Sequence, residues 1–215
     1  MWHTERVQFP VDNAPRACRV GWNPMAETQL AEVLALIDRI VESDSERRDR
    51  TRRFVTVGIG GHGGSGKSTL ARAITGSRSG AGVQIVATDS FWDGAQFDLP
   101  RLRTQVLDTL LRGETAVYDE WDWHATRLNR RRSVEPIGVV VIEGVCALHQ
   151  MFRADLDVRI WVDAPHDLRL TRGVARDGEA MRSTWTDVWM PSEEAYVARD
   201  HPVAVAQFIF DGTRP

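Results

Sequence analysis

The chain has 215 residues, of which 42% are hydrophobic and 27% are charged, a composition that predicts one compact domain and leaves no room for a second full one. The formal net charge of −3 excludes a basic nucleic-acid coat protein, so we expect no nucleic-acid partner. The chain lacks an apolar run of the roughly 20 residues that span a bilayer, and it lacks an apolar N-terminal signal. Its two cysteines, Cys18 and Cys146, are too few for a disulfide framework. We therefore expect a cytoplasmic protein without membrane contact.

Residues 1–50 are predicted to form an N-terminal extension that carries one amphipathic helix. Between Leu30 and Val41 the apolar residues recur at helical spacing, which gives a single apolar stripe. The polar sequence SDSERRDRTRR follows and links this helix to a domain over residues 51–215. The extension could cover the domain or mediate contacts, and the sequence does not choose between these.

Short apolar runs alternate with helical stretches from Phe54 onward. The predicted strands are FVTVGI (54–59), VQIVATD (83–89), GVVVIEG (138–144), VRIWVD (158–163) and QFIFDG (207–212). Helices are expected after Lys67, Leu99, His166 and Pro191. Strands that are nearly continuous in Val and Ile are typical of burial on both faces. The alternation therefore predicts an α/β fold with a parallel sheet, helices on both faces and a ligand site at the carboxyl ends of the strands.

A glycine-rich loop follows the first predicted strand and leads directly into a helix. Its sequence matches G-x-x-x-x-G-K-[ST], with the predicted phosphate-binding residues Gly61, Gly63, Gly64, Ser65, Gly66, Lys67, Ser68 and Thr69. Backbone amides of such a loop and the positive end of the helix bind phosphate oxygens. Lys67 is expected to contact the β and γ oxygens and Ser68 to bind Mg²⁺. The loop predicts a nucleotide phosphate site, with MgATP as the expected ligand.

Two carboxylates follow predicted strands, Asp89 after VQIVAT and Glu143 after GVVVI. Acidic residues at strand ends are often helix caps or solvated turns. Beside a phosphate loop, however, a magnesium ion needs oxygen ligands, so we predict a metal site of Ser68, Asp89 and Glu143. Asp89 is also the candidate general base toward the hydroxyl group of a small-molecule acceptor.

Several motifs together resemble the uridine kinase family. They are GHGGSGKST (61–69), TDSFW (88–92), FDLP (97–100), VYD (117–119), VIEGV (141–145) and DLRLTRGVARD (167–177). The resemblance implies a three-layer P-loop NTPase fold, with a five-stranded parallel sheet in the order 2-3-1-4-5 when strands are counted along the chain. It implies that Asp89 is the base and a metal neighbour, that Glu143 helps to hold Mg²⁺, that Asp98 binds sugar hydroxyls and that Tyr118 lines the acceptor pocket. Members of the family often form homo-oligomers, although nothing in this sequence shows one.

The family's arginine lid corresponds to about residues 166–182. Arg169, Arg172 and Arg176 are spaced three and four apart, so they project from one helical face. We expect Arg169 to act on the transferred phosphoryl group and the other two to bind nucleotide phosphates. A solvated cationic face with ion pairs to Asp167 or Asp177 is the alternative. The family's Arg-Gly-Arg is missing after Asp177, and Arg182 is at best a loose substitute.

A hairpin insertion is expected at about residues 113–136. Alternation along a strand would place Tyr118, Glu120, Asp122 and His124 on one face and two tryptophans on the other. Asp98, Tyr118, Asp122 and His124 are therefore the candidate substrate-binding residues. His124 is only an approximate counterpart of the family's base-contacting histidine and could be an ordinary surface group. Trp121 and Trp123 could pack in the core or stack on a ring.

Four functions remain open from the sequence. The first is an ATP-dependent kinase for a nucleoside such as uridine or cytidine, and the second is a kinase for a nucleoside monophosphate or a sugar-like metabolite. Two acidic residues in the predicted pocket favour a neutral acceptor. The third is a switch or motor NTPase, although no Asn-Lys-x-Asp string for guanine occurs. The fourth is a catalytically weak nucleotide-binding regulator, which the joint presence of Lys67, Ser68, Asp89 and Glu143 disfavours.

Overall fold

The structure is a computed structural model that describes residues 24–46, 53–78, 82–123 and 125–213. Its strands are β1 (Arg53–Gly61), β2 (Val83–Ala87), β3 (Ala116–Asp122), β4 (Arg127–Val134), β5 (Ile137–Glu143), β6 (Val158–Asp163) and β7 (Phe208–Asp211). Its α-helices are α1 (Pro24–Glu46), α2 (Lys67–Ser77), α3 (Leu99–Leu102), α4 (Asp108–Leu111), α5 (His166–Asp177), α6 (Arg182–Thr184), α7 (Met190–Asp200) and α8 (Pro202–Val205). Short 3₁₀ segments are η1 (Thr88–Phe91), η3 (Arg153–Asp155) and η4 (Glu179–Met181), and π-type segments are η2 (Arg103–Leu107) and η5 (Trp185–Trp189).

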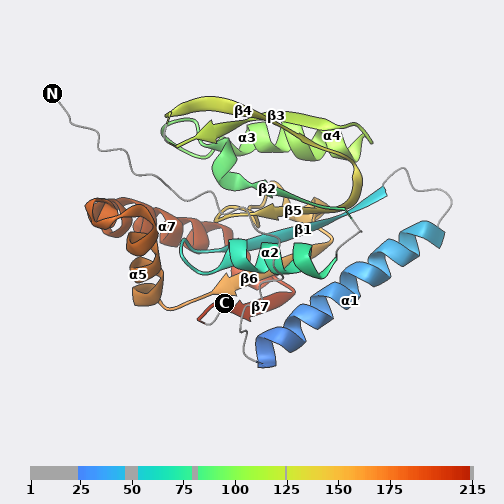
Figure 1. Ribbon diagram of the computed structural model, residues 1–215, viewed down its shortest axis with the longest axis horizontal. Coiled ribbons are helices and arrows are strands. Elements are labelled where there is room, and N and C mark those ends of the chain that lie inside the picture. Colours follow the sequence, from blue (N-terminus) through green and yellow to red (C-terminus); the bar gives the residue numbers. More distant parts are fainter. Residues whose placement is uncertain (1–23, 47–52, 79–81, 124, 214–215) are drawn as a thin grey trace.

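Five strands form one parallel sheet in the order β2-β5-β1-β6-β7. These are the five predicted strands, so the predicted order 2-3-1-4-5 and the α/β fold class are confirmed. The hairpin of β3 and β4 lies outside this sheet and forms an antiparallel pair. Figure 1 shows the hairpin on one side of the sheet, α1 on the other and α5 and α7 at one end.

The sheet is buried on both faces, which explains the continuous apolar character of its strands. In β5, Val139 and Val141 belong to the core that α1 and α2 cover. Val140 and Ile142 belong to the opposite core, which contains residues of η2, α4 and the hairpin. Successive side chains of a strand point to opposite faces, so each strand must supply apolar residues to both cores.

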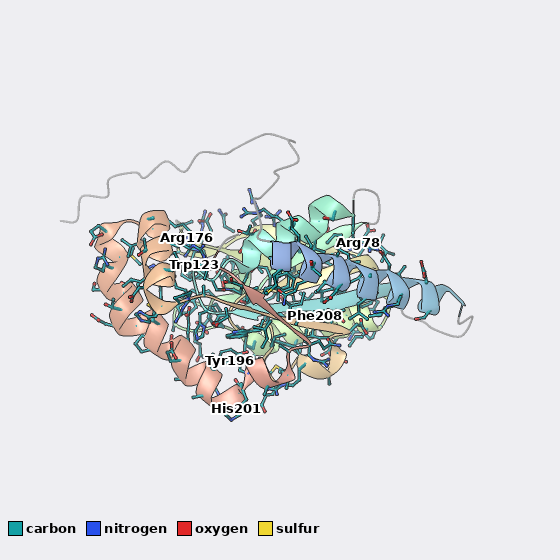
Figure 2. The ribbon with its side chains drawn as sticks, turned by 90° about the horizontal axis from the view of Figure 1, so that it is seen from below. Arg78, Trp123, Arg176, Tyr196, His201 and Phe208 are labelled. Carbon is teal, nitrogen blue, oxygen red and sulfur yellow. The ribbon has the colours of Figure 1, made fainter. Side chains whose placement is uncertain are left out.

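Helix α1 packs into the core that it shares with α2 through the apolar stripe seen in the sequence. Val33 and Ile37 are fully buried there, together with residues of β1, β6 and β7. Arg78, just beyond α2, forms an ion pair with Asp38 of α1 and lies far from Arg176 in Figure 2. The Gln29 side chain donates a hydrogen bond of 2.9 Å to the Ile209 carbonyl. Helix α1 therefore shares the core of the sheet and is not a separate unit.

The hairpin shows an irregularity where the sequence predicts simple alternation. The register shifts between Glu120 and Trp121, because Glu120 pairs with Arg130 and Trp121 with Leu128, which leaves Asn129 of β4 as the extra residue of a bulge. Residues Ala116, Tyr118 and Val134 anchor the hairpin in the core. The buried anchors of the hairpin therefore all lie on one side of the bulge, away from the hairpin turn.

Residues 1–23 and most of the predicted polar link lie outside the described ranges. The N-terminal extension is therefore described only through α1, and its boundary at about residue 50 stays a prediction. None of the helices in the described part of the chain has the length and apolar character that crossing a bilayer requires.

Ile37→Ala should lower the free energy of unfolding by about 2–4 kcal/mol, because it removes a fully buried side chain and leaves a cavity between α1 and the sheet. Urea unfolding measures this loss. The control is Val41→Ala on the same helix, where the side chain is 38% exposed and the loss should stay below about 1 kcal/mol. Equal losses for the two variants would contradict the packing of α1 on the sheet.

Candidate functional site

The carboxyl ends of three neighbouring strands meet at the glycine-rich loop. Ile59 of β1 lies opposite Glu143 of β5, and Glu143 lies opposite Ala87 of β2. The residues that follow these strands are therefore delivered to one edge of the sheet. They include the loop over residues 61–69, Glu143 itself and Asp89 in η1.

The loop adopts a backbone conformation that requires glycine at particular points. Gly64 has φ +75°, and a Cβ added there would lie 2.5 Å from the Arg169 carbonyl oxygen. Gly66 has φ +107° and precedes α2, whose Leu70 amide donates to the Gly66 carbonyl at 3.1 Å. The loop therefore turns tightly into the helix, and α5 packs against its backbone.

Lys67 is buried on the inner side of the loop. Its Nζ donates a hydrogen bond of 2.7 Å to the His62 carbonyl oxygen. Burial lowers the pKa of Lys67, while the negative charges of Glu143, Asp89 and Glu193 oppose that shift. The ammonium group is thus held among carboxylates at the start of the loop.

Ser68 and Glu143 are joined by a hydrogen bond, which brings a hydroxyl oxygen and a carboxylate oxygen together beside the loop. Ser68 Oγ donates to Glu143 Oε1 at 3.1 Å. Burial raises the pKa of Glu143, and Lys67 acts in the opposite direction. The described residues contain no cluster of three His, Cys, Asp or Glu side chains that could hold a metal by itself. Mg²⁺ commonly binds through one or two carboxylates together with substrate phosphates, and this hydroxyl and carboxylate fit such a site.

Asp89 belongs to η1, immediately after β2. The Thr88 hydroxyl donates to Asp89 Oδ1 at 3.4 Å. The strand ends are closely packed here, because a Cβ added at Gly144 would lie 1.8 Å from Thr88 Oγ1. Asp89 influences the pKa of both Lys67 and Glu143, which places its charge near theirs.

The three predicted lid arginines have three different environments. Arg169 is buried, and its Nε donates to the Ala164 carbonyl at 3.1 Å. Arg172 Nη1 donates to the carbonyl oxygens of Gly64 at 3.3 Å and Gly212 at 2.7 Å, so it ties the loop to the end of β7. Arg176 pairs with Asp177 at 2.7 Å and is the most exposed of the three. Each of these arginines borders the loop or its carboxylates, but Arg172 is engaged by backbone carbonyls.

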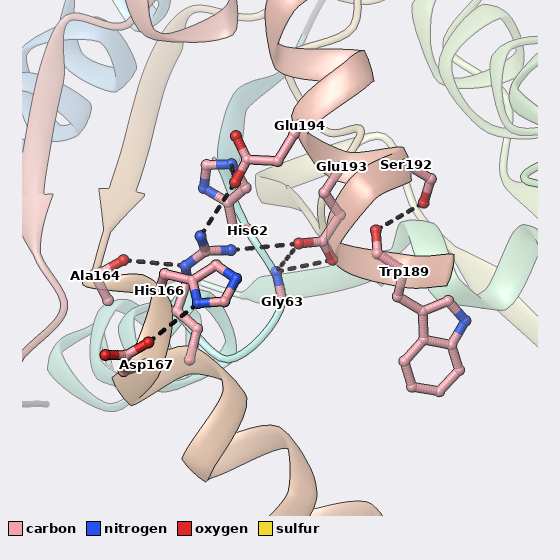
Figure 3. Close-up of polar contacts among 10 residues, drawn as sticks. His62, Gly63, Ala164, His166, Asp167, Trp189, Ser192, Glu193 and Glu194 are labelled. Atoms are coloured by element: carbon pink, nitrogen blue, oxygen red, sulfur yellow. Dashed lines mark hydrogen bonds and ion pairs between the residues drawn. The ribbon is translucent and has the colours of Figure 1, made fainter. Parts of the chain in front are cut away.

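Sequence reasoning missed a network that joins α7 to the loop (Figure 3). Both carboxylate oxygens of Glu193 accept a hydrogen bond from the Gly63 amide at 3.0 Å. Arg169 Nη1 lies 3.6 Å from Glu193 Oε2, and Arg169 Nη2 lies 3.4 Å from Glu194 Oε1. Burial lowers the pKa of His62 to about 4, and the neighbouring Arg169 charge adds to this. His62 is therefore neutral near pH 7, and its 3.8 Å contact with Glu194 is not an ion pair.

A groove of about 300 Å³ runs between β2 and the hairpin, beside η1. It is lined by Gln84, Ile85, Ala87, Ser90, Tyr118, Glu120, Arg132, Ser133 and Val134. Within it the Glu120 carboxylate accepts from Ser90 Oγ at 3.3 Å and from Arg132 Nε at 2.9 Å. Ser90 directly follows Asp89, so the groove opens next to the predicted base.

The predicted substrate-binding residues are not all brought together. Tyr118 lines the groove, packs on Phe91 with ring centroids 4.8 Å apart, and has a pKa raised to about 12, mainly by burial. Asp98 caps α3 by accepting from the Arg101 amide at 3.0 Å. Asp122 accepts from the Ala125 amide at 2.9 Å in the hairpin turn and does not line the groove. His124 lies outside the described residues.

The predicted tryptophans form an aromatic cluster with Trp92. Trp121 and Trp123 lie 6.5 Å apart edge to face, and Trp123 lies 5.4 Å from Trp92. Trp123 remains 46% exposed. The cluster packs the hairpin tip onto the segment after η1.

Comparison with known proteins finds uridine kinases among the relatives of this chain by sequence. No family model matches the chain. A uridine kinase from Deinococcus deserti is 33% identical over 145 residues, which are 59% of this chain and 69% of that protein. The structure of a possible uridine kinase from Bacillus stearothermophilus has a TM-score of 0.55 at 20% identity and covers 84% of this chain and 100% of that one. D-glycerate 3-kinase from Cryptococcus neoformans has a TM-score of 0.57 at 13% identity, with 90% and 98% covered. At these identities the two structures establish the fold alone.

Gly64→Ala should weaken the binding of a magnesium nucleotide at least about tenfold and lower the free energy of unfolding by about 1–3 kcal/mol. The added Cβ would overlap the Arg169 carbonyl and favour a different φ. Calorimetric titration and urea unfolding measure the two effects. Gly76→Ala in α2, where an added Cβ meets nothing within 4 Å, is the control and should change neither property adversely. Identical behaviour of the two variants would contradict the described loop conformation.

Proposed function

The chain belongs to the uridine kinase family, and from that membership we propose that it transfers the γ-phosphoryl group of ATP to a hydroxyl group of a nucleoside such as uridine or cytidine. The observation that carries the proposal is the hydrogen bond between Ser68 and Glu143 beside the buried Lys67. It unites a hydroxyl, a carboxylate and an ammonium group at the end of a phosphate loop. Phosphoryl transfer needs this combination of charges more than it needs covalent chemistry.

Each residue has a distinct part in the proposed reaction. The loop amides and Lys67 bind the phosphates, and Ser68 and Glu143, with Asp89 nearby, would hold Mg²⁺. When bound, the metal neutralises phosphate charge. The oxygen of the acceptor hydroxyl bonds to the γ-phosphorus, and Asp89 accepts the proton of that hydroxyl. The bond between the γ-phosphorus and the bridging oxygen of the β-phosphate breaks, which releases ADP.

The groove beside Asp89 is the proposed acceptor site. The buried Tyr118 hydroxyl stays protonated near neutral pH, because its pKa is about 12, so it can donate a hydrogen bond. Glu120 offers acceptor oxygens on the same wall. Asp98, Asp122 and His124 stay proposals as substrate contacts, since two of them are engaged in local turns and one is not described.

Arg132 favours a second candidate within the same chemistry. Its guanidinium lines the groove and remains 46% exposed despite the bond to Glu120. A cation at that point would suit an anionic acceptor, such as a nucleoside monophosphate or a sugar acid.

Incubation with MgATP and a panel of nucleosides, nucleoside monophosphates, sugars and sugar acids should release ADP only when a suitable acceptor is present. The expected acceptor is a pyrimidine nucleoside, because the groove offers a phenol donor and a carboxylate acceptor. Phosphorylated product and ADP should appear in equal amounts. Turnover with an anionic acceptor alone would support the second candidate, and ADP release that is independent of every acceptor would contradict a kinase.

Asp89→Asn should lower kcat by on the order of 10² or more while leaving nucleotide affinity within a few fold, because the amide cannot accept the hydroxyl proton. Steady-state rates and calorimetry separate the two quantities. The matched control is Asp93→Asn, four residues along, whose carboxylate is exposed and accepts hydrogen bonds from the Ala95 and Gln96 amides in a turn. A variant at Asp89 with unchanged kcat would remove this residue from the mechanism.

A further inference from the structure

The Glu193 carboxylate occupies a place where the loop presents a donor to an anion. Its two oxygens share the Gly63 amide at 3.0 Å. Arg169 Nη1 lies 3.6 Å from Glu193 Oε2. Glu193 itself is 8% exposed. An acidic side chain of α7 thus contacts both a loop amide and a buried guanidinium.

The groups around Glu193 compensate only in part for the loss of water around its negative charge. Burial raises the pKa of Glu193, which means that the charged form is poorly solvated here. Arg169 is 4% exposed, and among the described residues its Nη1 makes no hydrogen bond. A buried guanidinium normally uses its donors, because a donor left unpaired in the interior has lost its hydrogen bonds to water without replacement. The amide and the guanidinium together form an anion site that the carboxylate fills imperfectly.

Lys67 indicates which anion the site suits. Its ammonium group reaches the carbonyl oxygen of His62, the residue directly before Gly63. The lysine of such a loop reaches the β- and γ-phosphates. The Gly63 amide therefore lies at the end of the loop that receives the outer phosphates, opposite the end where α2 begins.

We infer that Glu193 holds the position of the terminal phosphoryl group and that a bound nucleoside triphosphate displaces it. This inference rests on the proposed function and adds a residue that competes with the γ-phosphate at the same site. A triphosphate would replace one carboxylate by a phosphoryl group with three oxygens, which can use both Gly63 and Arg169. A diphosphate does not reach this position, so Glu193 can return when ADP is present.

The contacts around Gly63 show that the segment that carries Glu193 packs closely on the loop. A Cβ added at Gly63 would lie 2.7 Å from Glu193 Oε1 and 2.8 Å from Cη2 of Trp185. Trp185 also covers Gly173 of α5, where an added Cβ would lie 2.4 Å from its ring. The loop, α5 and α7 are therefore packed on one another. Within this packing, Glu193 forms the hydrogen bond with the Gly63 amide.

Glu193→Gln should tighten the binding of a non-hydrolysable magnesium ATP analogue about tenfold and change the binding of magnesium ADP by less than about threefold. Glutamine keeps the shape of the side chain and removes the charge that competes with the γ-phosphate. Calorimetric titration of both nucleotides measures the difference. The control is Asp187→Asn in η5, an exposed carboxylate on the segment before α7, which should change neither affinity by more than about threefold.

Equal tightening for both nucleotides, or no tightening of the analogue, would overturn the assignment of Glu193 to the terminal position. Melting temperatures check that the variants fold. Glu193→Ala, which removes the carboxylate entirely, should show the same difference between the nucleotides and serves if the glutamine variant is unstable. A wild-type chain that binds neither nucleotide would refute the proposed function as well, whereas tight but unaltered binding in the variants would refute this inference alone.

Discussion

The parallel pairing of β1 with β5 and of β5 with β2 is the constraint on which the site depends. Ile59 lies opposite Glu143, and Glu143 lies opposite Ala87. Three segments that are far apart in the sequence therefore end side by side, and each is followed by a group that the site uses. A slip of one residue in β5 would turn Glu143 to the other face of the sheet and break its bond to Ser68.

Local sequence was sufficient for the loop and for the strands. The spacing of glycines, Lys67 and Ser68 has a meaning that does not depend on distant residues, and the runs of Val and Ile indicate burial on both faces. The strand order came from the family resemblance, since a single sequence does not state which strands pair. The bulge after Glu120 could not be predicted, because it arises from the pairing of β3 with β4.

Glu193 was missed for a related reason. Its helix has the sequence MPSEEAYVARD, in which neighbouring acidic residues are typical of a solvated face. Glu194 is exposed as that pattern suggests, whereas Glu193 is buried against the loop. Trp185 packs on Gly63 and Gly173, so this segment lies against the loop, and only the tertiary packing reveals which of the two glutamates faces it.

The loop forms hydrogen bonds with Arg172 of the lid and with Glu193 of α7. These two bonds differ in whether a bound phosphate could replace them. Arg172 bonds the carbonyls of Gly64 and Gly212, and a phosphate cannot take the place of a carbonyl acceptor without leaving those carbonyls unpaired. Glu193 bonds an amide, and a phosphate oxygen is an equivalent acceptor for an amide. The hydrogen bond to a loop carbonyl thus fixes the shape of the loop, whereas at the loop amide a phosphate oxygen can replace the carboxylate. A phosphotransferase requires both properties, because its loop must keep one shape while it binds and releases anions in every turnover.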